Sequence, residues 1–385
     1  MSPDFDRAQF VILSSIDWDA AWQRHQIFAS RLAEAGHQVF FVGNTGFRDP
    51  GLADLGRLWG KVRGPAASGG VNPRPPGLTL IEPRVLPPTG RLLRAANRGL
   101  LIPRLVRELA RRGLRPGAVV ISYFATATTL DLLGRLEPGL VVYDCASNFR
   151  AHPQAPADFA RLEAELLARC QLVVCDSDFL FRQKQAEHGN VAQIHQGVSE
   201  DFFRAAPPRP DFRRFCYYGS WVPDLDCGFL NALSRAGFEV TVSGFVRGAA
   251  PAWDPGIRRL PPVPLARLVD RLEGFDAFLL PHKLTPFHMG VVPAKIYECL
   301  AMGRPVLAVP LPSLEPFRGL ISIGETPQRW VELARGLPQA ETAELRGKRI
   351  ALARQHTHAA EFQRFRERIR QAWQGRPGGS GPGRG

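Results

Sequence analysis

The stretch VPAKIYECLAMGRPVLA, residues 292–308, predicts a loop, a short helix and a buried strand in close succession. Pro293 suits the first turn of the helix, where the missing N–H removes no hydrogen bond. Gly303 suits the turn that ends the helix, and the apolar run from Pro305 to Val309 predicts the strand. This order of elements is typical of an α/β domain.

Two charged residues of this stretch suggest a ligand. Lys295 and Glu298 are three residues apart, so they project from nearly the same face of the helix. A diphosphate at the helix start would meet free backbone N–H groups and the Lys295 ammonium. Glu298 could accept hydrogen bonds from ribose hydroxyls. We therefore predict a nucleotide-sugar site here; the alternative is an amphipathic surface helix with an ion pair.

Length and composition predict a two-domain protein. The 385 residues exceed what one hydrophobic core usually organises, and 45% of them are apolar. We expect a cytoplasmic location, because no apolar run approaches the length of a membrane span and the N-terminus carries acids instead of a basic leader. The six cysteines form no C-x-x-C pair, so we expect reduced thiols and no metal site.

Strand-like apolar runs alternate with helical patterns, which indicates parallel α/β architecture in both halves of the chain. A helix is expected at 22–35, a basic Gly/Pro-rich insertion at 48–88, and a linker around Pro207, Pro208 and Pro210. The expected strands are 10–13, 38–42, 118–122, 140–143 and 172–175 in the first half, and 214–218, 239–242, 277–280 and 305–309 in the second.

Small and polar residues follow many of these strands, at the sheet edge where ligands bind in such folds. They are also ordinary turn residues, so each position has a structural alternative. The positions are Ser14, Ser15, Asp17 and Trp18 after the first strand, Asp144 and Asp176 later in the first half, and Gly219, Ser220, Ser243, Gly244 and His282 in the second.

Several motifs together resemble the two-domain GT-B glycosyltransferases, nearest to the branches around glycosyltransferase family 4 and the bacterial xanthan-type glucuronosyltransferases. The resemblance covers most of the chain. The motifs are WQRH at 22–25, LAEAGHQV at 32–39, VYDC at 142–145, DS at 176–177, IHQGVSEDFF at 194–203, CYYGS at 216–220 and, most strongly, residues 293–306.

The resemblance implies two Rossmann-like domains. An acceptor-binding domain would cover 1–205, a nucleotide-sugar domain 206–358 and a helix crossing back 359–374, with a disordered tail at 375–385. It implies a UDP- or GDP-linked sugar donor and no cofactor. The implied donor-binding residues are Gly219, Ser220, Gly290, Lys295 and Glu298, and the acceptor-binding residues are Ser15, Asp17, Trp18 and Arg24.

One departure concerns the mechanism. Retaining members of the large family carry two glutamates eight positions apart, and the first of these falls at Gly290 here. The departure favours the branch in which Lys295 and Glu298 contact the donor, and it allows inversion. An inverting enzyme needs a base for the acceptor hydroxyl. Asp144 is the first candidate because it follows a buried strand, and His25 is the second.

The formal charge of +13 requires a partner, and its distribution suggests one. Residues 91–115 contain eight arginines and a single acid, Glu108, interleaved with leucines. Such a basic amphipathic segment can lie on anionic lipid headgroups. We expect peripheral contact with the cytoplasmic membrane face and a glycan or lipid-linked acceptor. Only five of the 49 basic residues are lysine, so arginine-rich composition is the alternative; nucleic acid is not expected.

Two other functions remain open at this point. A sugar-nucleotide epimerase could use the same two-domain architecture, and a non-catalytic polysaccharide-pathway protein could retain a degenerate donor site, as Gly290 suggests. Three D-x-D pairs, at 17–19, 176–178 and 224–226, would suit a metal-dependent transferase of another fold, but two spaced acids are a weak signal. The sequence favours glycosyl transfer in cell-surface polysaccharide synthesis.

Overall fold

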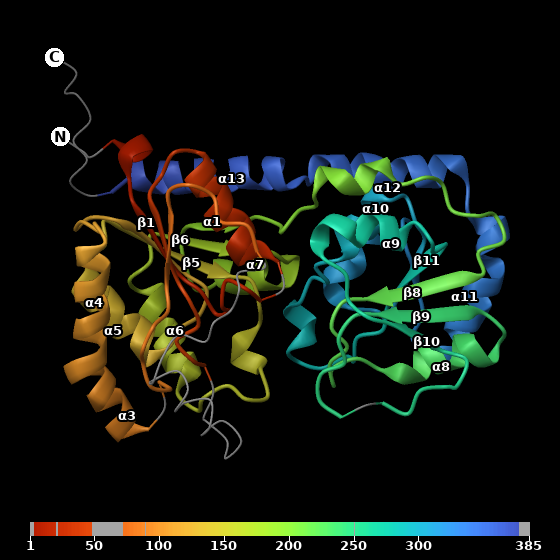
Figure 1. Cartoon of the computed structure of the whole chain (residues 1–385), viewed down its shortest axis with the longest axis horizontal. Helices are drawn as coiled ribbons and strands as arrows, with labels where there is room; N and C mark the ends of the chain where they lie inside the picture. The colour runs from red at the N-terminus through yellow and green to blue at the C-terminus, as the bar shows by residue number, and fades with distance from the viewer. Residues whose placement is uncertain (1–3, 21, 48–71, 89, 250, 377–385) are drawn as a thin grey trace. The chain divides into compact units, whose positions relative to one another are not determined.

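The computed structural model describes residues 4–20, 22–47, 72–88, 90–249 and 251–376, and it divides into two compact units (Figure 1). Unit 1 comprises Met1–Ile194 and Phe362–Gly385, and unit 2 comprises His195–Glu361. The change of unit at Ile194 precedes the prolines around which the sequence placed a linker. Residues 48–71 of the predicted insertion and 377–385 of the predicted tail lie outside the described residues.

Unit 1 is built on a parallel sheet of seven strands in the order β3-β2-β1-β4-β5-β6-β7. The strands are all parallel, so the polar side chains that follow them lie at one edge of the sheet. The order in which successive strands are added reverses between β1 and β4, which makes this the topological switch point where ligands bind in such folds. The strands are β1 Phe10–Leu13, β2 Val39–Val42, β3 Leu78–Ile81, β4 Val119–Ser122, β5 Leu140–Cys145, β6 Leu172–Cys175 and β7 Val191–Gln193.

Helices cover both faces of this sheet, and a separate apolar cluster fills each face. Continuous Val, Ile and Phe runs in β1, β2 and β4 suit strands that are buried on both sides. The helical segments are α1 Arg24–Glu34, α3 Arg91–Ala96, the π-helical η3 Asn97–Leu101, α4 Ile102–Arg111, α5 Ala127–Leu136, α6 Phe159–Leu167 and α7 Asp178–Gln185, with short 3₁₀ turns η1 Phe5–Arg7 and η4 Phe149–Ala151.

Two predictions for unit 1 need correction. The expected insertion at 48–88 contains β3, a four-residue edge strand that pairs with β2. The run Leu-Thr-Leu-Ile is too short to stand out beside its Gly and Pro neighbours. The basic segment 91–115 is not one regular helix, because the π-helical turn η3 separates α3 from α4 and the last helical residue is Arg111.

Unit 2 contains a parallel sheet of six strands in the order β10-β9-β8-β11-β12-β13. The strands are β8 Arg214–Tyr218, β9 Glu239–Ser243, β10 Arg258–Leu260, β11 Ala277–Leu280, β12 Val306–Ala308 and β13 Ser322–Ile323. The helical segments are α8 Cys227–Arg235, α9 Leu268–Leu272, α10 Ile296–Ala301, α11 Pro327–Ala340 and α12 Ala343–Gln355, with 3₁₀ turns η5 Glu200–Arg204, η6 Leu265–Arg267, η7 His288–Gly290 and η8 Pro312–Phe317. These two parallel sheets confirm the predicted two-domain α/β fold class.

The stretch at 292–308 folds as a loop, a helix and a strand, with one shift. Helix α10 begins at Ile296 with Lys295 as its N-cap, so Pro293 lies before the helix and not in its first turn. Gly303 follows the helix with a φ of +66°, and its N–H bonds to the Leu300 carbonyl. A left-handed glycine at this position is the expected helix terminator.

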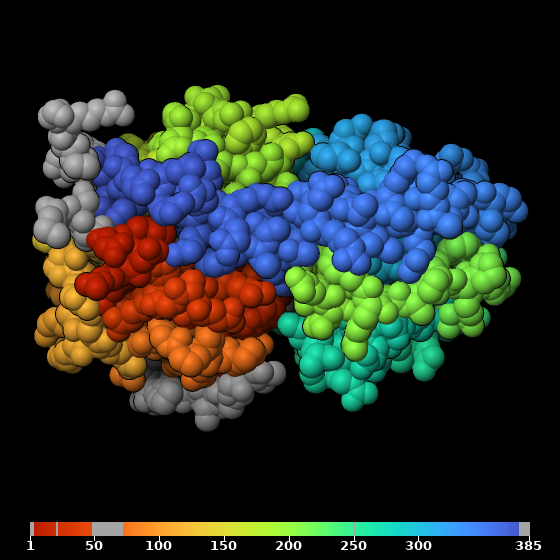
Figure 2. All heavy atoms as spheres, turned by 90° about the horizontal axis from the view of Figure 1, so that it is seen from above, coloured from red at the N-terminus to blue at the C-terminus, as the bar shows by residue number. Residues whose placement is uncertain are grey.

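The last helix, α13 His358–Gln374, starts in unit 2, and its residues from Phe362 onward belong to unit 1. Phe365 is fully buried and stacks on Phe28 of α1, with ring centroids 4.5 Å apart. Arg366 forms an ion pair with Asp6. Figure 2 shows the last helix against the first residues of unit 1. The C-terminal residues therefore contribute to the core of the N-terminal sheet.

Removing the Phe365 ring should destabilise unit 1. Phe365→Ala leaves a cavity beside Phe28, and such truncations cost about 3–5 kcal/mol in free energy of unfolding. Urea unfolding followed by tryptophan fluorescence measures the loss. Phe245→Ala is the matched control, because Phe245 is 57% exposed, and it should change the free energy by less than about 0.5 kcal/mol. Equal losses in the two variants would contradict this role of α13.

Candidate functional site

Most of the predicted site residues gather in two clusters, one in each unit, together with further residues that follow the sheet strands; Asp17, Trp18 and Gly290 belong to neither cluster. In unit 2 we define the Lys295 cluster as Tyr218, Gly219, Ser220, Gly244, His282, Lys295 and Glu298. In unit 1 we define the Arg24 cluster as Ser15, Arg24, His25, Tyr123, Asp144 and Asp176.

Lys295 packs against the backbone of Gly219, which follows β8. A Cβ placed on Gly219 would lie 2.7 Å from Lys295 Cε and 3.0 Å from Nζ, so no larger residue fits without moving the lysine. The ammonium also lies 5.2 Å from the centre of the Tyr217 ring and 5.8 Å from that of Tyr218. Aromatic faces attract cations. These contacts hold the Lys295 ammonium at the carboxyl end of β8.

Two glycines let the loops after β8 and β9 approach each other. Gly219 has a φ of +105° and Gly244 a φ of +149°, conformations that side chains disfavour. A Cβ on Gly244 would overlap the Gly219 carbonyl oxygen. Ser220, the next residue, accepts a hydrogen bond at its Oγ from Arg247 Nε at 3.3 Å. A backbone surface without side chains is what close approach of a ligand requires.

Glu298 lies on α10 behind Lys295 and is partly buried. Its Oε2 accepts a hydrogen bond of 2.8 Å from the Tyr218 hydroxyl. Burial raises the pKa of Glu298, while Tyr218 and Lys295 oppose that shift. The i,i+3 ion pair with Lys295, which the alternative surface-helix interpretation implied, is not among the recorded ion pairs of the described residues. The lysine charge thus remains available to a ligand.

Two histidines lie near Lys295: His282, which the sequence analysis placed at the ligand-binding edge of the sheet without a specific role, and His288. Burial, with the Lys295 and His288 charges, lowers the pKa of His282 to about 3, so its imidazole is neutral at physiological pH. Its Nδ1 is buried without a hydrogen-bond partner among the described residues. His288 in η7 bonds Thr285 through Nδ1 at 2.8 Å. Gly290 ends that turn and is buried, close in sequence to Lys295 but with no side chain to offer.

The Arg24 cluster is organised by a buried ion pair. Arg24 Nε lies 2.8 Å from Asp144 Oδ2 and 3.0 Å from Oδ1, and the Arg24 Nη1 donates to the Ile194 carbonyl. Asp144 is fully buried and Arg24 is 2% exposed. Burial raises the pKa of Asp144, and Arg24 opposes that shift. Arg24 was predicted to bind acceptor and Asp144 to take a proton; the structure shows them bonded to each other.

Asp176, which follows β6, is the titratable group of this cluster that the predicted residue set omitted. Burial raises the pKa of Asp176 to about 8. The positive charge of Arg24 lowers this pKa, and the negative charge of Asp144 raises it. Desolvation by burial is the largest cause of this shift, and Arg24, whose charge opposes it, is hydrogen-bonded to Asp144. Asp176 therefore changes protonation near neutral pH. The Asp176-Ser177 motif was the only sequence signal for it.

The side chains of His25 and Ser15, for which the sequence proposed separate catalytic and acceptor-binding roles, lie together. The Ser15 Oγ and His25 Nε2 are 3.0 Å apart, and the His25 ring stacks on Tyr123 with centroids separated by 3.7 Å. Burial and the Arg24 charge lower the pKa of His25 to about 3. His25 Nδ1 and Arg24 Nη2 are buried polar atoms without hydrogen-bond partners among the described residues. Such atoms mark a place where a polar ligand or water would be stabilised.

Asp17 and Trp18 take structural positions. Asp17 Oδ1 accepts a hydrogen bond from the Asn44 N–H and so holds the loop after β2. Trp18 is 4% exposed and packs edge-on against Phe41 and Trp22. A buried indole offers little surface to an acceptor, and the recorded ring contacts of Trp18 are not with members of the Arg24 cluster.

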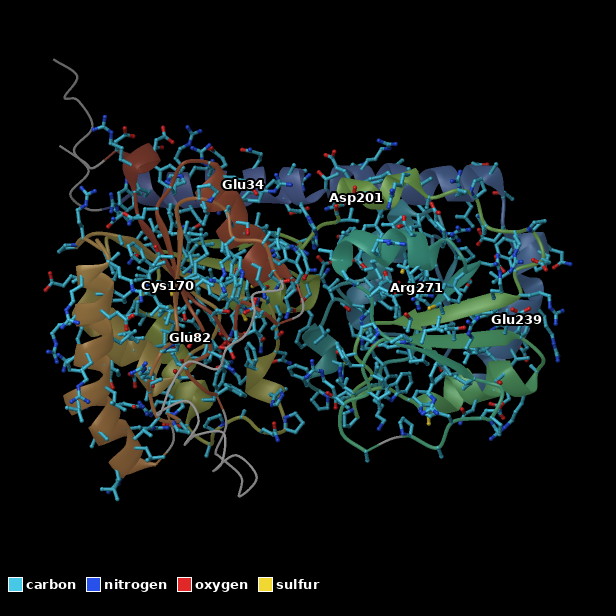
Figure 3. All side chains as sticks on the ribbon, in the orientation of Figure 1. Glu34, Glu82, Cys170, Asp201, Glu239 and Arg271 are labelled. Carbon is cyan, nitrogen blue, oxygen red and sulfur yellow. The ribbon has the colours of Figure 1, made fainter. Side chains whose placement is uncertain are left out.

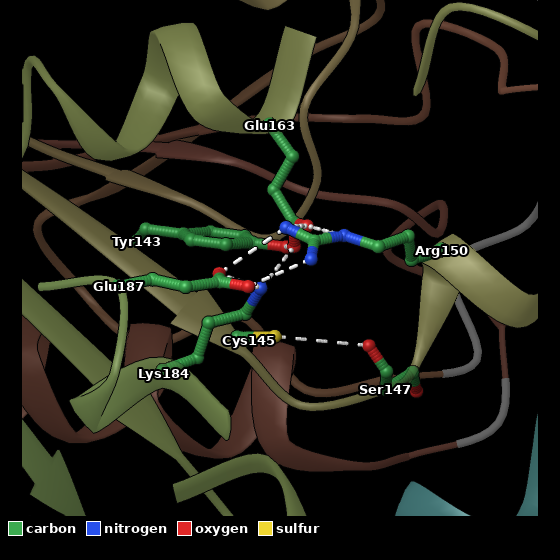
Figure 4. Close-up of polar contacts among 7 residues, drawn as sticks. All are labelled: Tyr143, Cys145, Ser147, Arg150, Glu163, Lys184 and Glu187. Carbon is green, nitrogen blue, oxygen red and sulfur yellow. Dashed lines mark hydrogen bonds and ion pairs between the residues drawn. The ribbon is translucent and has the colours of Figure 1, made fainter. Parts of the chain in front are cut away.

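A charged network holds the loop that follows Asp144 (Figure 4). Glu163 accepts hydrogen bonds from the Tyr143 hydroxyl and Arg150 Nε, both at 2.7 Å, and Lys184 Nζ lies 3.0 Å away. Arg150 and Lys184 also bind Glu187. Two cations thus balance two carboxylates, and the network fixes the β5 loop to α6 and α7.

No protein-family model matches the chain. One curated relative matches, a Bacillus subtilis protein that carries the name teichuronic acid biosynthesis glycosyltransferase TuaH. The two chains are 22% identical over 209 residues, which are 45% of this chain and 51% of the relative. The match therefore spans about half the length of that relative.

Similar solved structures show the fold. Anabaena HepE in complex with UDP and glucose has a TM-score of 0.66 at 12% identity, covering 94% of this chain and 100% of that chain. Sucrose-phosphate synthase from Thermosynechococcus elongatus has a TM-score of 0.65 at 15% identity, covering 94% and 98%. A glycosyltransferase from Rickettsia africae scores 0.63 at 11% identity, covering 96% and 100%. These likenesses confirm the predicted GT-B fold; they do not single out family 4.

Lys295→Ala should weaken binding of UDP and UDP-sugars while leaving unit 2 folded. Loss of one ammonium–phosphate interaction costs about 1.5–3 kcal/mol of binding free energy. Isothermal titration with UDP measures it. Lys348→Ala is the matched control, because Lys348 is exposed on α12 and pairs only with Glu344 in the described part of the chain. Unchanged UDP affinity in Lys295→Ala would remove the lysine from the donor site.

Proposed function

We propose that this protein is a glycosyltransferase that moves a sugar from a nucleotide diphosphate donor to a hydroxyl of a glycan or lipid-linked acceptor, in cell-surface polysaccharide synthesis. The observation that carries the proposal is the Lys295 cluster, a lysine held against the Gly219 backbone after β8, which in turn touches Gly244 after β9, at the carboxyl end of a parallel sheet. Anabaena HepE, which has the same fold, holds UDP and glucose. The TuaH match supports a role in polysaccharide synthesis.

Unit 2 would hold the donor. The Gly219 and Gly244 loops expose backbone to the diphosphate, and Lys295 supplies the positive charge. Glu298 would accept hydrogen bonds from ribose hydroxyls, with Tyr218 keeping its carboxylate in place. Uracil is the base that the fold neighbours support, since HepE structures contain UDP and UDP-glucose. A GDP-linked donor has no such support.

Unit 1 would hold the acceptor at the Arg24 cluster, with Ser15 and His25 as polar contacts. The acceptor oxygen attacks the anomeric carbon, the bond to the diphosphate breaks, and the hydroxyl proton passes to a carboxylate. This is an inverting displacement, which the glycine at position 290 allows. Asp144 is engaged by Arg24, so we assign the proton to Asp176, whose pKa of about 8 suits a base working near neutral pH.

We propose that unit 1 also contacts a membrane surface, where a lipid-linked acceptor would lie. Leu92 and Leu100 are 85% and 49% exposed on α3 and η3, beside exposed Arg91. Apolar side chains next to arginines suit an interfacial position on anionic lipid. Within the described residues, no helix is long and apolar enough to cross a bilayer. We propose that this α3 surface rests on anionic headgroups at the cytoplasmic membrane face.

The function is tested by transfer. Purified protein with UDP-sugars should release UDP and extend an acceptor supplied in bacterial membranes or as oligosaccharide. UDP-sugar converted to its epimer without an acceptor would identify the epimerase alternative. UDP binding with no turnover of any donor would identify the non-catalytic one. Either outcome contradicts the proposed transfer.

On the same preparation, Asp176→Asn should lower turnover by about 100-fold with donor affinity unchanged. The base must be ionised, so parent turnover should rise as the pH approaches 8 and then level. The residual turnover of the variant should lose that rise. His25→Gln is the comparison variant and should keep the rise in turnover, because a histidine with a pKa near 3 cannot produce a rise toward pH 8. A pH profile that persists in Asp176→Asn would exclude Asp176 as the base.

Parent protein should cosediment with anionic vesicles at low salt, and less at high salt. Arg94 and Arg98 are poor test sites, because they pair with Asp158 and Asp131. Leu92→Ser with Leu100→Ser should therefore reduce binding, while Leu265→Ser with Leu284→Ser, two exposed leucines of unit 2, should not. Equal binding by all variants would contradict the α3 surface.

A further inference from the structure

Unit 1 contains a groove of about 1040 Å³ that shares no residue with the Arg24 cluster. Its walls come from β3, the segment after β3, and α4. Six arginines line it: Arg74, Arg84, Arg104, Arg107, Arg111 and Arg112. We call it the β3–α4 groove.

The lining is strongly positive. Two glutamates, Glu82 and Glu108, accompany the six arginines, which leaves a net of four positive charges. Glu82, labelled in Figure 3, directly follows β3. Glu108 is bound by Arg112 at 2.9 Å. Such a concentration of one sign on the wall of a concavity attracts a multivalent anion.

Most of these arginines have no recorded ion-pair partner among the described residues. In the described part of the chain, no ion pair is recorded for Arg74, Arg84, Arg104 or Arg111, and all four are exposed. Their neighbours Arg94 and Arg98, outside the groove, each bind an aspartate. Aspartates neutralise these two arginines beside the groove, whereas Arg74, Arg84, Arg104 and Arg111 have no recorded counter-charge among the described residues.

The charges run along a line. Arg104, Arg107 and Arg111 are spaced by three and four residues, so they share one face of α4 and span about 10 Å along its axis. On the opposite wall, Arg74 precedes β3 and Arg84 follows it. Four strand residues extend about 13 Å. An elongated ligand with repeated negative charges matches this arrangement better than one isolated phosphate.

The groove also has an apolar part. Leu80, Val85 and Leu101 line it and are partly exposed, and Leu105 contributes from beneath. A ligand with apolar C–H faces between its charges would cover these side chains, which a chain of inorganic phosphates would not. Sugar rings that carry carboxylates or phosphates have both features.

We propose that the β3–α4 groove binds an acidic saccharide chain, a polymer with a carboxylate or phosphate on successive sugars, as a second site that retains the growing glycan on unit 1. This inference rests on the proposed transferase function and specifies the acceptor class. The concavity favours a chain over a planar bilayer, and the leucines assigned to the membrane, Leu92 and Leu100, do not line the groove.

The test measures binding of a fluorescein-labelled oligogalacturonate by anisotropy, with a labelled malto-oligosaccharide of equal length as the neutral comparison. The groove variant is Arg104→Gln with Arg111→Gln. The control is Arg258→Gln with Arg259→Gln, which removes the same net charge from exposed positions on β10 of unit 2. All four residues are exposed, so the fold should persist, and thermal unfolding checks that it does.

The parent should bind the acidic chain, bind it less at high salt, and ignore the neutral one. The groove variant should bind at least about tenfold more weakly, and the control within about twofold of the parent. Equal losses in both variants, equal binding of the neutral chain, or full competition by inorganic phosphate would overturn the proposal. The proposal would also be overturned if substitution of Arg104 and Arg111 weakened binding to vesicles but left binding to oligogalacturonate unchanged.

UDP titration of the same preparations separates this result from the proposed function. The groove variant should bind UDP as the parent does, because no groove residue belongs to the Lys295 cluster. Parent protein that binds the acidic chain but neither binds UDP nor transfers sugar would support the groove and contradict the transferase. Parent protein that binds UDP and transfers sugar but has no affinity for the acidic chain would support the transferase and contradict the groove proposal.

Discussion

The contact between Lys295 and the bare backbone of Gly219 is the constraint on which the proposed donor site depends. A single added Cβ at Gly219 would displace the lysine, and one at Gly244 would overlap the Gly219 carbonyl. Two positive φ angles therefore fix the loops after β8 and β9, and those loops fix the position of the charge. The arrangement places an ammonium, free of any recorded ion pair within the described residues, beside exposed backbone, which is the chemistry that a diphosphate requires.

Charge balance shapes the other unit in the opposite way. One buried arginine, Arg24, faces Asp144 and Asp176 and bonds the first of them. The second carboxylate is left with a raised pKa, because burial without full compensation favours its neutral form. The Glu163 network, in contrast, is balanced and serves to hold the loop after β5. Unit 1 thus separates a structural charge network from a titrating group.

Apolar runs located nine of the strands, since buried parallel strands are continuous hydrophobic stretches. The four that were missed, β3, β7, β10 and β13, have two to four residues each, and only pairing with a neighbour stabilises such short runs. Lys295 and Glu298 were proposed from their spacing, Asp144 from the strand that precedes it, and Arg24 from the family resemblance. The sequence did not predict their partners, because the Arg24–Asp144 pair joins residues 120 apart and the raised pKa of Asp176 depends on burial. The β3–α4 groove could not be predicted either, because β3 forms part of its wall and was not predicted from the sequence.

The most direct test of the central claim is hydrogen exchange of the intact protein with and without UDP, followed by mass spectrometry. Bound ligand slows exchange of the amides that it covers or orders. The account predicts protection in peptides that contain Gly219, Gly244 and Lys295, with Lys295→Ala losing it and Lys348→Ala keeping it. Protection confined to peptides of the Arg24 cluster, or none at saturating UDP, would contradict the assignment of the donor to unit 2.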